Sequence, residues 1–268
     1  DWEAYQVPDP DKPGRLDELK ALVNRFKGTR AIGCHLHDSF SYPSYLFGMA
    51  ELLMNLIQEP EWVKEVIEAC NRHCIRMVEL AVQAGADFIQ FGDDVGGKSG
   101  PLMSPAHYEE FFLPGLAHVV EKTHELGAYA LKHTDGNVSA YLDMFADVGI
   151  DAFHPSDPSA GMDIVEVKRN YGEKFVVCGG IDTGAQLSEW PVERLVEQVR
   201  RRISELAPGG GWMIASSNTV HSSVKPENYQ AQVLATRVYG NYANLNEPVD
   251  PELEKLIGRV PMSQSCQG

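Results

Sequence analysis

The amino-acid sequence predicts an α/β fold in which parallel strands form a (β/α)8 TIM-type barrel. Strand-like apolar runs alternate with helical segments along most of the 268 residues, which is the order that a parallel sheet with covering helices requires. Each strand-like run is followed by histidine, aspartate or asparagine. Barrels of this class place their sites at the carboxyl ends of the strands, so the two observations support each other.

Six strands can be recognised along the chain, at residues 30–35, 87–92, 127–132, 152–154, 175–179 and 211–216. Helices are expected between them, at residues 17–27, 45–58, 61–84, 105–126, 138–148, 163–171, 191–206 and 226–240. The length of the chain favours a closed barrel over an open doubly wound sheet. A complete barrel has eight strands, so we expect this chain to lack the N-terminal part of the barrel or to hold strands too irregular to recognise.

The helix expected at residues 61–84 has the clearest helical periodicity. Val63, Val66 and Ile67 recur at the spacing that places them on one face of a helix. Pro60 precedes this helix and Gly85 follows it, as helix boundaries favour. An amphipathic helix that packs on the sheet is therefore expected here.

Three segments follow from this pattern. An acidic, proline-rich segment with one helix covers residues 1–29, the barrel covers residues 30–240, and a tail covers residues 241–268. The chain begins at Asp1 without an initiator Met, so we expect further sequence upstream. A dinucleotide or P-loop site has no support, because neither glycine-rich fingerprint follows a strand.

Charge and cysteine content narrow the class of partner. The net charge of −15 argues against nucleic acid and anionic membrane surfaces, which attract basic patches. No apolar run is long enough to cross a bilayer. The five scattered cysteines fit a reducing compartment, and we expect a cytoplasmic protein.

The six strand ends supply the candidate site residues. They read Cys34-His35-Leu36-His37-Asp38, Gly92-Asp93-Asp94, His133-Thr134-Asp135, His154-Pro155-Ser156-Asp157, Gly180-Ile181-Asp182 and Ser216-Ser217-Asn218-Thr219-Val220-His221. Asp157 and Asp182 are expected to cap turns, which aspartate favours. Histidine has no such preference, yet five of the nine histidines fall at these ends. A shared active site is therefore expected.

His133 and Asp135 are the leading pair at these ends. Residues two apart in an extended segment face the same side, so the two side chains are expected to act together. They would serve as metal ligands or as an acid/base pair. The alternative is a histidine with an ordinary structural partner beside an aspartate that caps the following helix.

The order of these segments resembles the uroporphyrinogen decarboxylase superfamily, including its corrinoid-dependent methyltransferase branch. The resemblance covers about residues 30–240. It is carried by Phe91-Gly-Asp-Asp-Val-Gly96, Leu102-Met-Ser-Pro-Ala-His-Tyr-Glu-Glu-Phe-Phe-Leu-Pro114, Lys132-His-Thr-Asp-Gly-Asn137, Cys178-Gly-Gly-Ile-Asp182, Gly210-Gly-Trp-Met-Ile-Ala-Ser-Ser-Asn218 and Lys225-Pro-Glu-Asn228. The superfamily's fold is a (β/α)8 barrel, which agrees with the alternation of strands and helices.

The resemblance implies a zinc site that this sequence alters. Thiol methyltransferases of the superfamily bind zinc through a His-x-Cys motif and a later Cys. Here His133 matches the histidine, Asp135 stands in place of the first Cys, and Asn218 stands in place of the later one. Zinc also accepts imidazole and carboxylate, so a zinc site of His133 and Asp135, with His221 as a third ligand, is expected to be weaker than a thiolate site.

Three functions remain open at this stage. The leading one is transfer of a methyl group between a small O- or N-methylated substrate and the cobalamin (corrinoid) of a partner protein. The alternatives are decarboxylation of a uroporphyrinogen-like substrate and a non-catalytic barrel subunit of a larger complex. The residues expected to be catalytic are His133, Asp135, Asp93 and His221; those expected to bind substrate are His35, His37, Asp94, His154 and Asn218.

Overall fold

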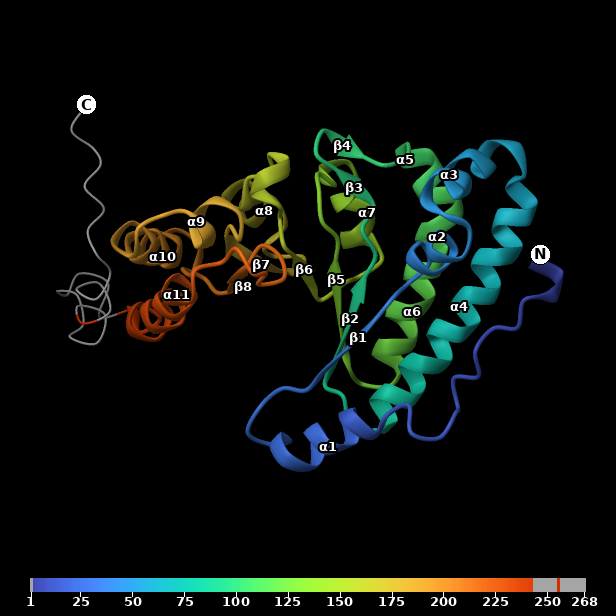
Figure 1. Cartoon of the computed structure of the whole chain (residues 1–268), viewed down its shortest axis with the longest axis horizontal. Helices are drawn as coiled ribbons and strands as arrows, with labels where there is room; N and C mark the ends of the chain where they lie inside the picture. Colours follow the sequence, from blue (N-terminus) through green and yellow to red (C-terminus); the bar gives the residue numbers. More distant parts are fainter. Residues whose placement is uncertain (1, 243–254, 256–268) are drawn as a thin grey trace. The chain divides into compact units, whose positions relative to one another are not determined.

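Parallel strands with helices between them make up both compact units into which the chain divides (Figure 1). The computed structural model describes residues 2–242 and residue 255, and the structural statements below concern these residues. Cys266 and nearly all of the expected tail, residues 241–268, lie outside them. The first unit covers residues 1–154 and 174–176, and the second covers residues 155–173 and those from 177 on.

The first unit contains a parallel sheet in which β1 pairs with β2, β2 with β5, and β5 with β6. A short antiparallel pair, β3 and β4, follows β2. The strand bounds are β1 (Gly33–Leu36), β2 (Phe88–Gly92), β3 (Gly96–Gly97), β4 (Gly100–Pro101), β5 (Tyr129–His133) and β6 (Ala152–His154).

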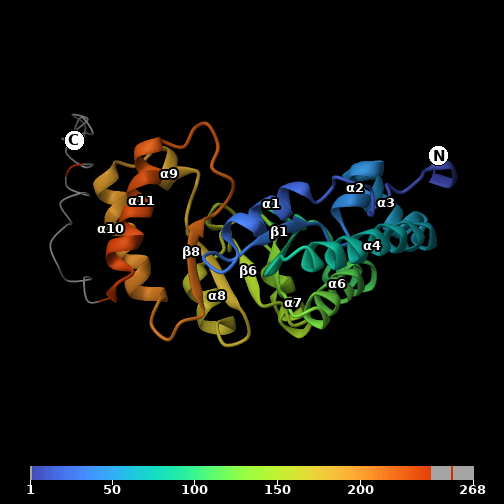
Figure 2. The same ribbon diagram turned by 90° about the horizontal axis from the view of Figure 1, so that it is seen from below.

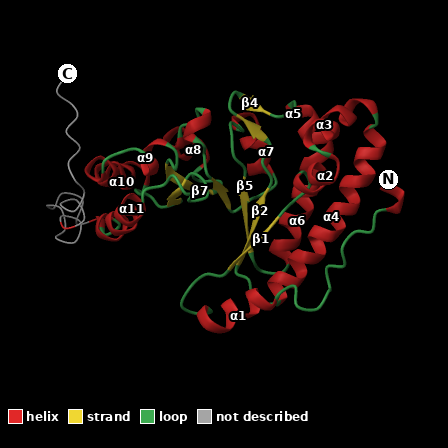
Figure 3. Ribbon diagram, in the orientation of Figure 1, coloured by secondary structure: helices red, strands yellow, loops and turns green. Residues whose placement is uncertain are grey.

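Two long helices of this unit lie side by side beside the sheet (Figure 3). They are α4 (Pro60–Gln83), which packs on β1, and α6 (Leu113–Glu125), which packs on β5. Val63, Val66 and Ile67 of α4 are buried, as their spacing predicts. The other α-helices of the unit are α1 (Asp17–Phe26), α2 (Ser41–Phe47), α3 (Met49–Gln58), α5 (Pro105–His107) and α7 (Leu142–Asp147).

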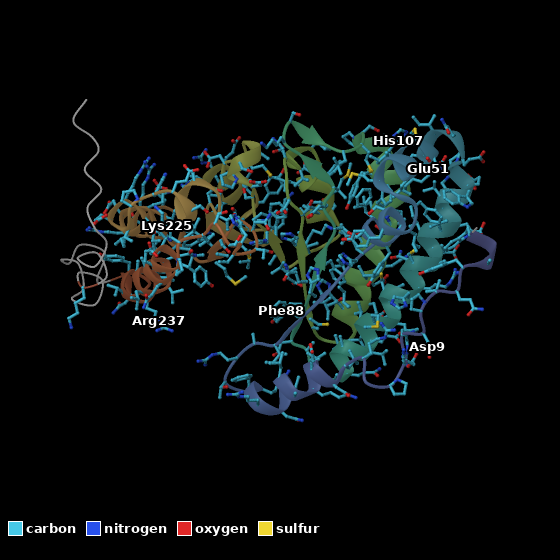
Figure 4. All side chains as sticks on the ribbon, viewed as in Figure 1. Asp9, Glu51, Phe88, His107, Lys225 and Arg237 are labelled. Atoms are coloured by element: carbon cyan, nitrogen blue, oxygen red, sulfur yellow. The ribbon has the colours of Figure 1, made fainter. Side chains whose placement is uncertain are left out.

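The register of the sheet aligns the carboxyl ends of its strands. Phe88 marks the amino end of β2 in Figure 4. Towards the other end of that strand, Gly92 pairs with His133, and His133 pairs with His154. The segments that follow β1, β2, β5 and β6 therefore start from one edge of the sheet, where parallel α/β folds build sites.

The second unit contains β8 (Trp212–Ser216) and all of β7 (Val176–Ile181) except Val176, and these two strands pair in parallel. Its helices are α8 (Ile164–Tyr171), α9 (Ala185–Ser188), α10 (Val192–Leu206) and α11 (Pro226–Tyr239). Helices α10 and α11 pack against each other (Figure 2), and their apolar faces share a core with Ile181 of β7.

Three expected helices are interrupted. The helix expected at residues 45–58 is two helices, α2 and α3, because Gly48 between them has a φ of 87°. The helix expected at 105–126 contains a π-helical turn over Tyr108–Phe112 between α5 and α6. The helix expected at 138–148 starts with a 3₁₀ turn, Ser139–Tyr141, before α7. Periodicity alone does not reveal where one helix ends and the next begins, or where a helix changes to π or 3₁₀ winding.

The predicted α/β class is confirmed, as parallel strands with alternating helices that form part of a TIM-type barrel. The β3–β4 pair was not expected, because it is built largely from glycine rather than from strand-forming residues. The boundaries 1–29, 30–240 and 241–268 stay a prediction.

Candidate active site

A fully buried lysine links the ends of three strands in the first unit. Lys132, in β5, is 0% exposed, and its Nζ donates to Asp38 Oδ2 at 2.6 Å and to the Asp93 carbonyl oxygen at 3.2 Å. Asp38 follows β1 and Asp93 follows β2. We call Asp38, Asp93, Lys132 and His37 the buried ionic cluster. Buried charges persist only when paired, and this set provides the pairing.

Asp93 connects the end of β2 to His37 and to the loop after β1. Its side chain is fully buried, and it accepts hydrogen bonds from the Phe40 backbone N–H at 2.6 Å and from His37 Nδ1 at 3.1 Å. Burial opposes ionisation, but the hydrogen bond from His37 and the charge of Lys132 outweigh it and lower the pKa of Asp93. Burial and the nearby charge of Asp93 raise the pKa of Asp38.

His37 is fixed through one ring nitrogen. Its Nδ1 contacts the Gly92 carbonyl oxygen at 2.5 Å as well as Asp93. A carbonyl only accepts, so Nδ1 carries the proton in this arrangement. Burial opposes protonation of the second nitrogen, but the hydrogen bond and charge of Asp93 outweigh burial and raise the pKa of His37. The side chain is 19% exposed.

Aromatic rings surround His37. Tyr42 and Tyr45 of α2 meet its ring edge-on, at centroid distances of 5.1 Å and 5.6 Å. Both tyrosines also line a small apolar cavity of about 140 Å³, together with Leu46, Cys70 and His73 among others. Burial raises the pKa of Tyr42 to about 12, so its hydroxyl stays neutral.

His35 contacts His37 and the end of β2. Its ring meets that of His37 edge-on at 5.4 Å. Burial, and then the proximity of His37, lowers the pKa of His35. The ring occupies the space beside Gly92, where an added Cβ would come within 2.3 Å of it. Glycine at position 92 therefore makes room for this histidine.

A second group combines one exposed side chain, Asp94, with two partly exposed ones, His133 and Asp135. Asp94, His133 and Asp135 each offer a ligand atom, and the three atoms lie within 4.8 Å of one another. His133 Nε2 is 3.7 Å from Asp94 Oδ1 and 3.7 Å from Asp135 Oδ1. Asp94 is 56% exposed, in contrast to its neighbour Asp93. We call these three residues the open acidic cluster.

His154 holds the other side of the His133 ring. The two Nδ1 atoms are 2.7 Å apart, and the rings stack at 5.0 Å. One Nδ1 donates and the other accepts, so the contact suits neutral rings. Burial, and then the adjacent His154, lowers the pKa of His133 to about 4. The imidazole of His133 is therefore neutral near pH 7, with Nε2 towards the carboxylates.

Close backbone packing positions the open acidic cluster. Gly136 has a φ of 82°, and a Cβ there would lie 2.4 Å from the Gly96 carbonyl carbon. The Asn137 N–H donates to the Gly97 carbonyl oxygen, and the Asp135 N–H donates to Asp94 Oδ1 at 3.0 Å. The loops after β2 and β5 are thus tied together with Asp94 and Asp135 between them.

The open acidic cluster fits a divalent cation. Ligand atoms about 2.1 Å from a tetrahedral zinc ion lie roughly 3.4 Å from one another, close to the spacing of His133 Nε2 and the two carboxylates. The His133 Nδ1 contact with His154 is also the second bond that orients metal-binding histidines. The donor set is nitrogen and oxygen without thiolate. It contains Asp94, which was expected from the sequence to bind substrate, and the zinc site of His133, Asp135 and His221 stays a prediction.

Asn218 and His221 lie in the second unit. They line a cavity of about 330 Å³ that also includes Asp157, Asp182 and Ser217. Asp157 accepts from the Ser159 N–H, and Asp182 accepts from the Gly184 and Ala185 N–H groups, so both cap turns as expected. The first unit brings together His35, His37, Asp93, Asp94, His133, Asp135 and His154. That Asn218 and His221 join them stays a prediction.

Sequence reasoning missed Lys132 and Asp38 as members of the site. The available signal was Lys132 itself, a lone charge in the otherwise apolar strand Tyr129–His133. A lysine in a buried strand requires an anionic partner. The sequence contains many aspartates, however, and only the fold identifies Asp38.

The family model for uroporphyrinogen decarboxylase (URO-D) matches residues 1–239 of this chain, which therefore belongs to that family. Curated relatives include the uroporphyrinogen decarboxylase of Thioalkalivibrio sulfidiphilus, 24% identical over 86% of this chain and 66% of the relative. That of Coxiella burnetii (strain Dugway 5J108-111) is 22% identical over 87% of this chain and 61% of the relative.

A solved methyltransferase from Methanosarcina mazei shares the fold. It aligns with a TM-score of 0.72 and 19% identity, over 84% of this chain and 64% of its own. The chain thus spans 66%, 61% and 64% of the lengths of these three proteins, which is slightly less than two thirds in each case. Among the described residues, no helix is both long and apolar enough to cross a membrane.

Proposed function

We propose that the protein is a methyltransferase that moves a methyl group from a small O- or N-methylated substrate to the cobalt of a corrinoid held by a partner protein. The observation that carries the proposal is the open acidic cluster of Asp94, His133 and Asp135. Demethylation of an ether or amine requires help for the leaving heteroatom, and a cation site beside histidines can supply it.

The residues of the open acidic cluster would each have a role in binding a zinc ion. His133 would offer Nε2 to a zinc ion, with Asp94 and Asp135 as carboxylate ligands and His154 orienting the ring. Zinc bound there would act as a Lewis acid towards the substrate heteroatom. We further propose that Asn218 binds substrate through its amide and that His221 assists catalysis.

Decarboxylation of a porphyrinogen is the second candidate, because the curated relatives carry that name. It would require a carboxylate that reaches the pyrrole, and Asp93 is buried and bonded to His37, Phe40 and Lys132. Asp94 is the exposed alternative. A polycarboxylate substrate also favours arginine, and the strand ends contain none.

The test mixes the full-length protein with a Co(I) corrinoid protein and a panel of methyl ethers and methylamines. Formation of methyl-cobalt is followed by absorbance, and release of carbon dioxide from uroporphyrinogen is followed in parallel. Methyl-cobalt that forms only with the protein present supports the proposal. Carbon dioxide release without methylation supports the decarboxylase. If neither reaction occurs, the result supports a non-catalytic subunit.

A further inference from the structure

We propose that His37, rather than His133, donates the proton to the leaving heteroatom, with Asp93 as the residue that positions it. This inference rests on the proposed methyl transfer and names a role within the same site. It follows from a comparison of the hydrogen bonds of the two rings.

The Nδ1 side of His37 is fully engaged. Nδ1 faces the Gly92 carbonyl oxygen at 2.5 Å and Asp93 Oδ1 at 3.1 Å. A carboxylate behind Nδ1–H fixes the ring and favours the imidazolium, so the proton to be exchanged is the one on Nε2. His133 has the opposite arrangement, because its Nδ1 faces another histidine at 2.7 Å.

Lys132 and the Phe40 backbone keep this dyad in place. Lys132 Nζ binds the Asp93 carbonyl oxygen, while the Phe40 N–H binds Asp93 Oδ2. The bond from Phe40 therefore holds the second carboxylate oxygen of Asp93 while the first faces His37. The groups that face His37 are Asp93 from the end of β2, Asp38 and His35 from β1 and its loop, and Tyr42 and Tyr45 from α2. The two acids favour its protonation, and Tyr42 is a neutral neighbour.

The proton balance of the reaction is complete. For a methyl ether, the Co(I) electron pair forms the new cobalt–carbon bond and cobalt becomes Co(III), while the carbon–oxygen bond pair leaves with oxygen. His37 Nε2–H gives its proton to that oxygen, which produces the alcohol or phenol and neutral His37. Solvent then returns a proton to the partly exposed ring. The pKa of His37 is raised by Asp93, which keeps the donor form available near neutral pH.

The test compares His37→Gln with wild type on a series of aryl methyl ethers whose phenols differ in acidity. Removal of a general acid typically lowers the rate about 100-fold or more. The decrease in rate should be larger when the leaving phenol is less acidic. An onium donor such as tetramethylammonium releases a neutral amine that needs no proton, so its rate should fall far less. His118→Gln, on the exposed side of α6, is the matched control and should match wild type.

Asp93→Asn separates positioning from folding. Above the pKa of His37, nitrogen-15 NMR should show the neutral ring with its proton on Nδ1 in wild type and a mixture of tautomers in the variant. The alkaline limb of kcat should move to lower pH. If the rates of wild type and His37→Gln depend equally on the acidity of the phenol, the inference is wrong but the proposed function is not affected. A wild type that methylates cobalt from onium donors but from no ether would also overturn it, whereas a wild type inactive with every donor overturns the proposed function as well.

Discussion

The buried ionic cluster and the open acidic cluster differ in what surrounds them, although Asp93 and Asp94 are consecutive residues. Asp93 is fully buried, hydrogen-bonded and close to Lys132, whereas Asp94 is 56% exposed and faces His133 at 3.7 Å. The difference shows that one strand end serves two purposes. Its inward carboxylate joins the strands and fixes His37, and its outward carboxylate remains available to a ligand.

The largest effect is expected from Lys132→Met. The change leaves the Asp38 carboxylate buried without its cation, which typically costs about 3–5 kcal/mol of unfolding free energy. Urea denaturation measures it. Asp94→Asn in the open acidic cluster should stay within about 0.5 kcal/mol of wild type.

The double variant Asp38→Asn/Lys132→Met tests the cause of that loss. Removal of both charges removes the unpaired carboxylate, so the double variant should be clearly more stable than Lys132→Met alone. Equal stability of the two would show that the lysine stabilises the protein by packing rather than by its charge.

Gly136→Ala should have the next largest effect. A left-handed φ costs alanine about 1–2 kcal/mol, and overlap with Gly96 adds about 1–3 kcal/mol. Gly161→Ala is the matched control, because its φ of 80° is similar and a Cβ there meets nothing within 4 Å. Thermal unfolding compares the two variants, and an equal loss would disprove the role of the Gly96 contact.

His133→Ala should lower zinc affinity more than it lowers stability. Loss of a partner that only orients a ligand typically lowers metal affinity about 10- to 100-fold, and loss of the ligand itself should lower it at least as much. Calorimetric titration of chelator-treated protein measures it, with His118→Ala as control. Tight stoichiometric zinc that survives His133→Ala would contradict the assignment of the open acidic cluster.

The smallest effect is a difference in titration between two histidines. In metal-free protein, NMR should show His133 titrating near pH 4 and His37 titrating above 6.5.

The two histidines also affect stability in opposite directions of pH. His133 binds a proton less readily in the folded protein than in the unfolded chain, so its contribution to stability is lost as pH falls from 6.5 towards about 4. The contribution of His37 is full below 6.5 and is lost as pH rises through its folded pKa. The same midpoint for both would remove the contrast between the clusters.

Much of the fold was predictable from local patterns. The periodicity of residues 61–84 predicts α4, and the apolar runs predict β2, β5 and β6 to within two residues. These patterns work because burial on one face repeats with the period of the element. The break at Gly48 and the π-helical turn at Tyr108–Phe112 were not predictable, because neither changes the hydrophobic pattern.

The sequence by itself determined the class of fold, the family and the set of polar residues at the strand ends. Only the tertiary structure decided which of them are paired. Alternation along a strand does not extend into the loop that follows it, so Asp93 and Asp94 are equivalent in sequence. Their different roles come from Lys132 and His37 on one side and His133 on the other, and these contacts join residues about 40 to 55 positions apart. Burial lowers the pKa of both His37 and His133, and the nearest partner decides the outcome: Asp93 raises the pKa of His37, whereas His154 lowers that of His133 further.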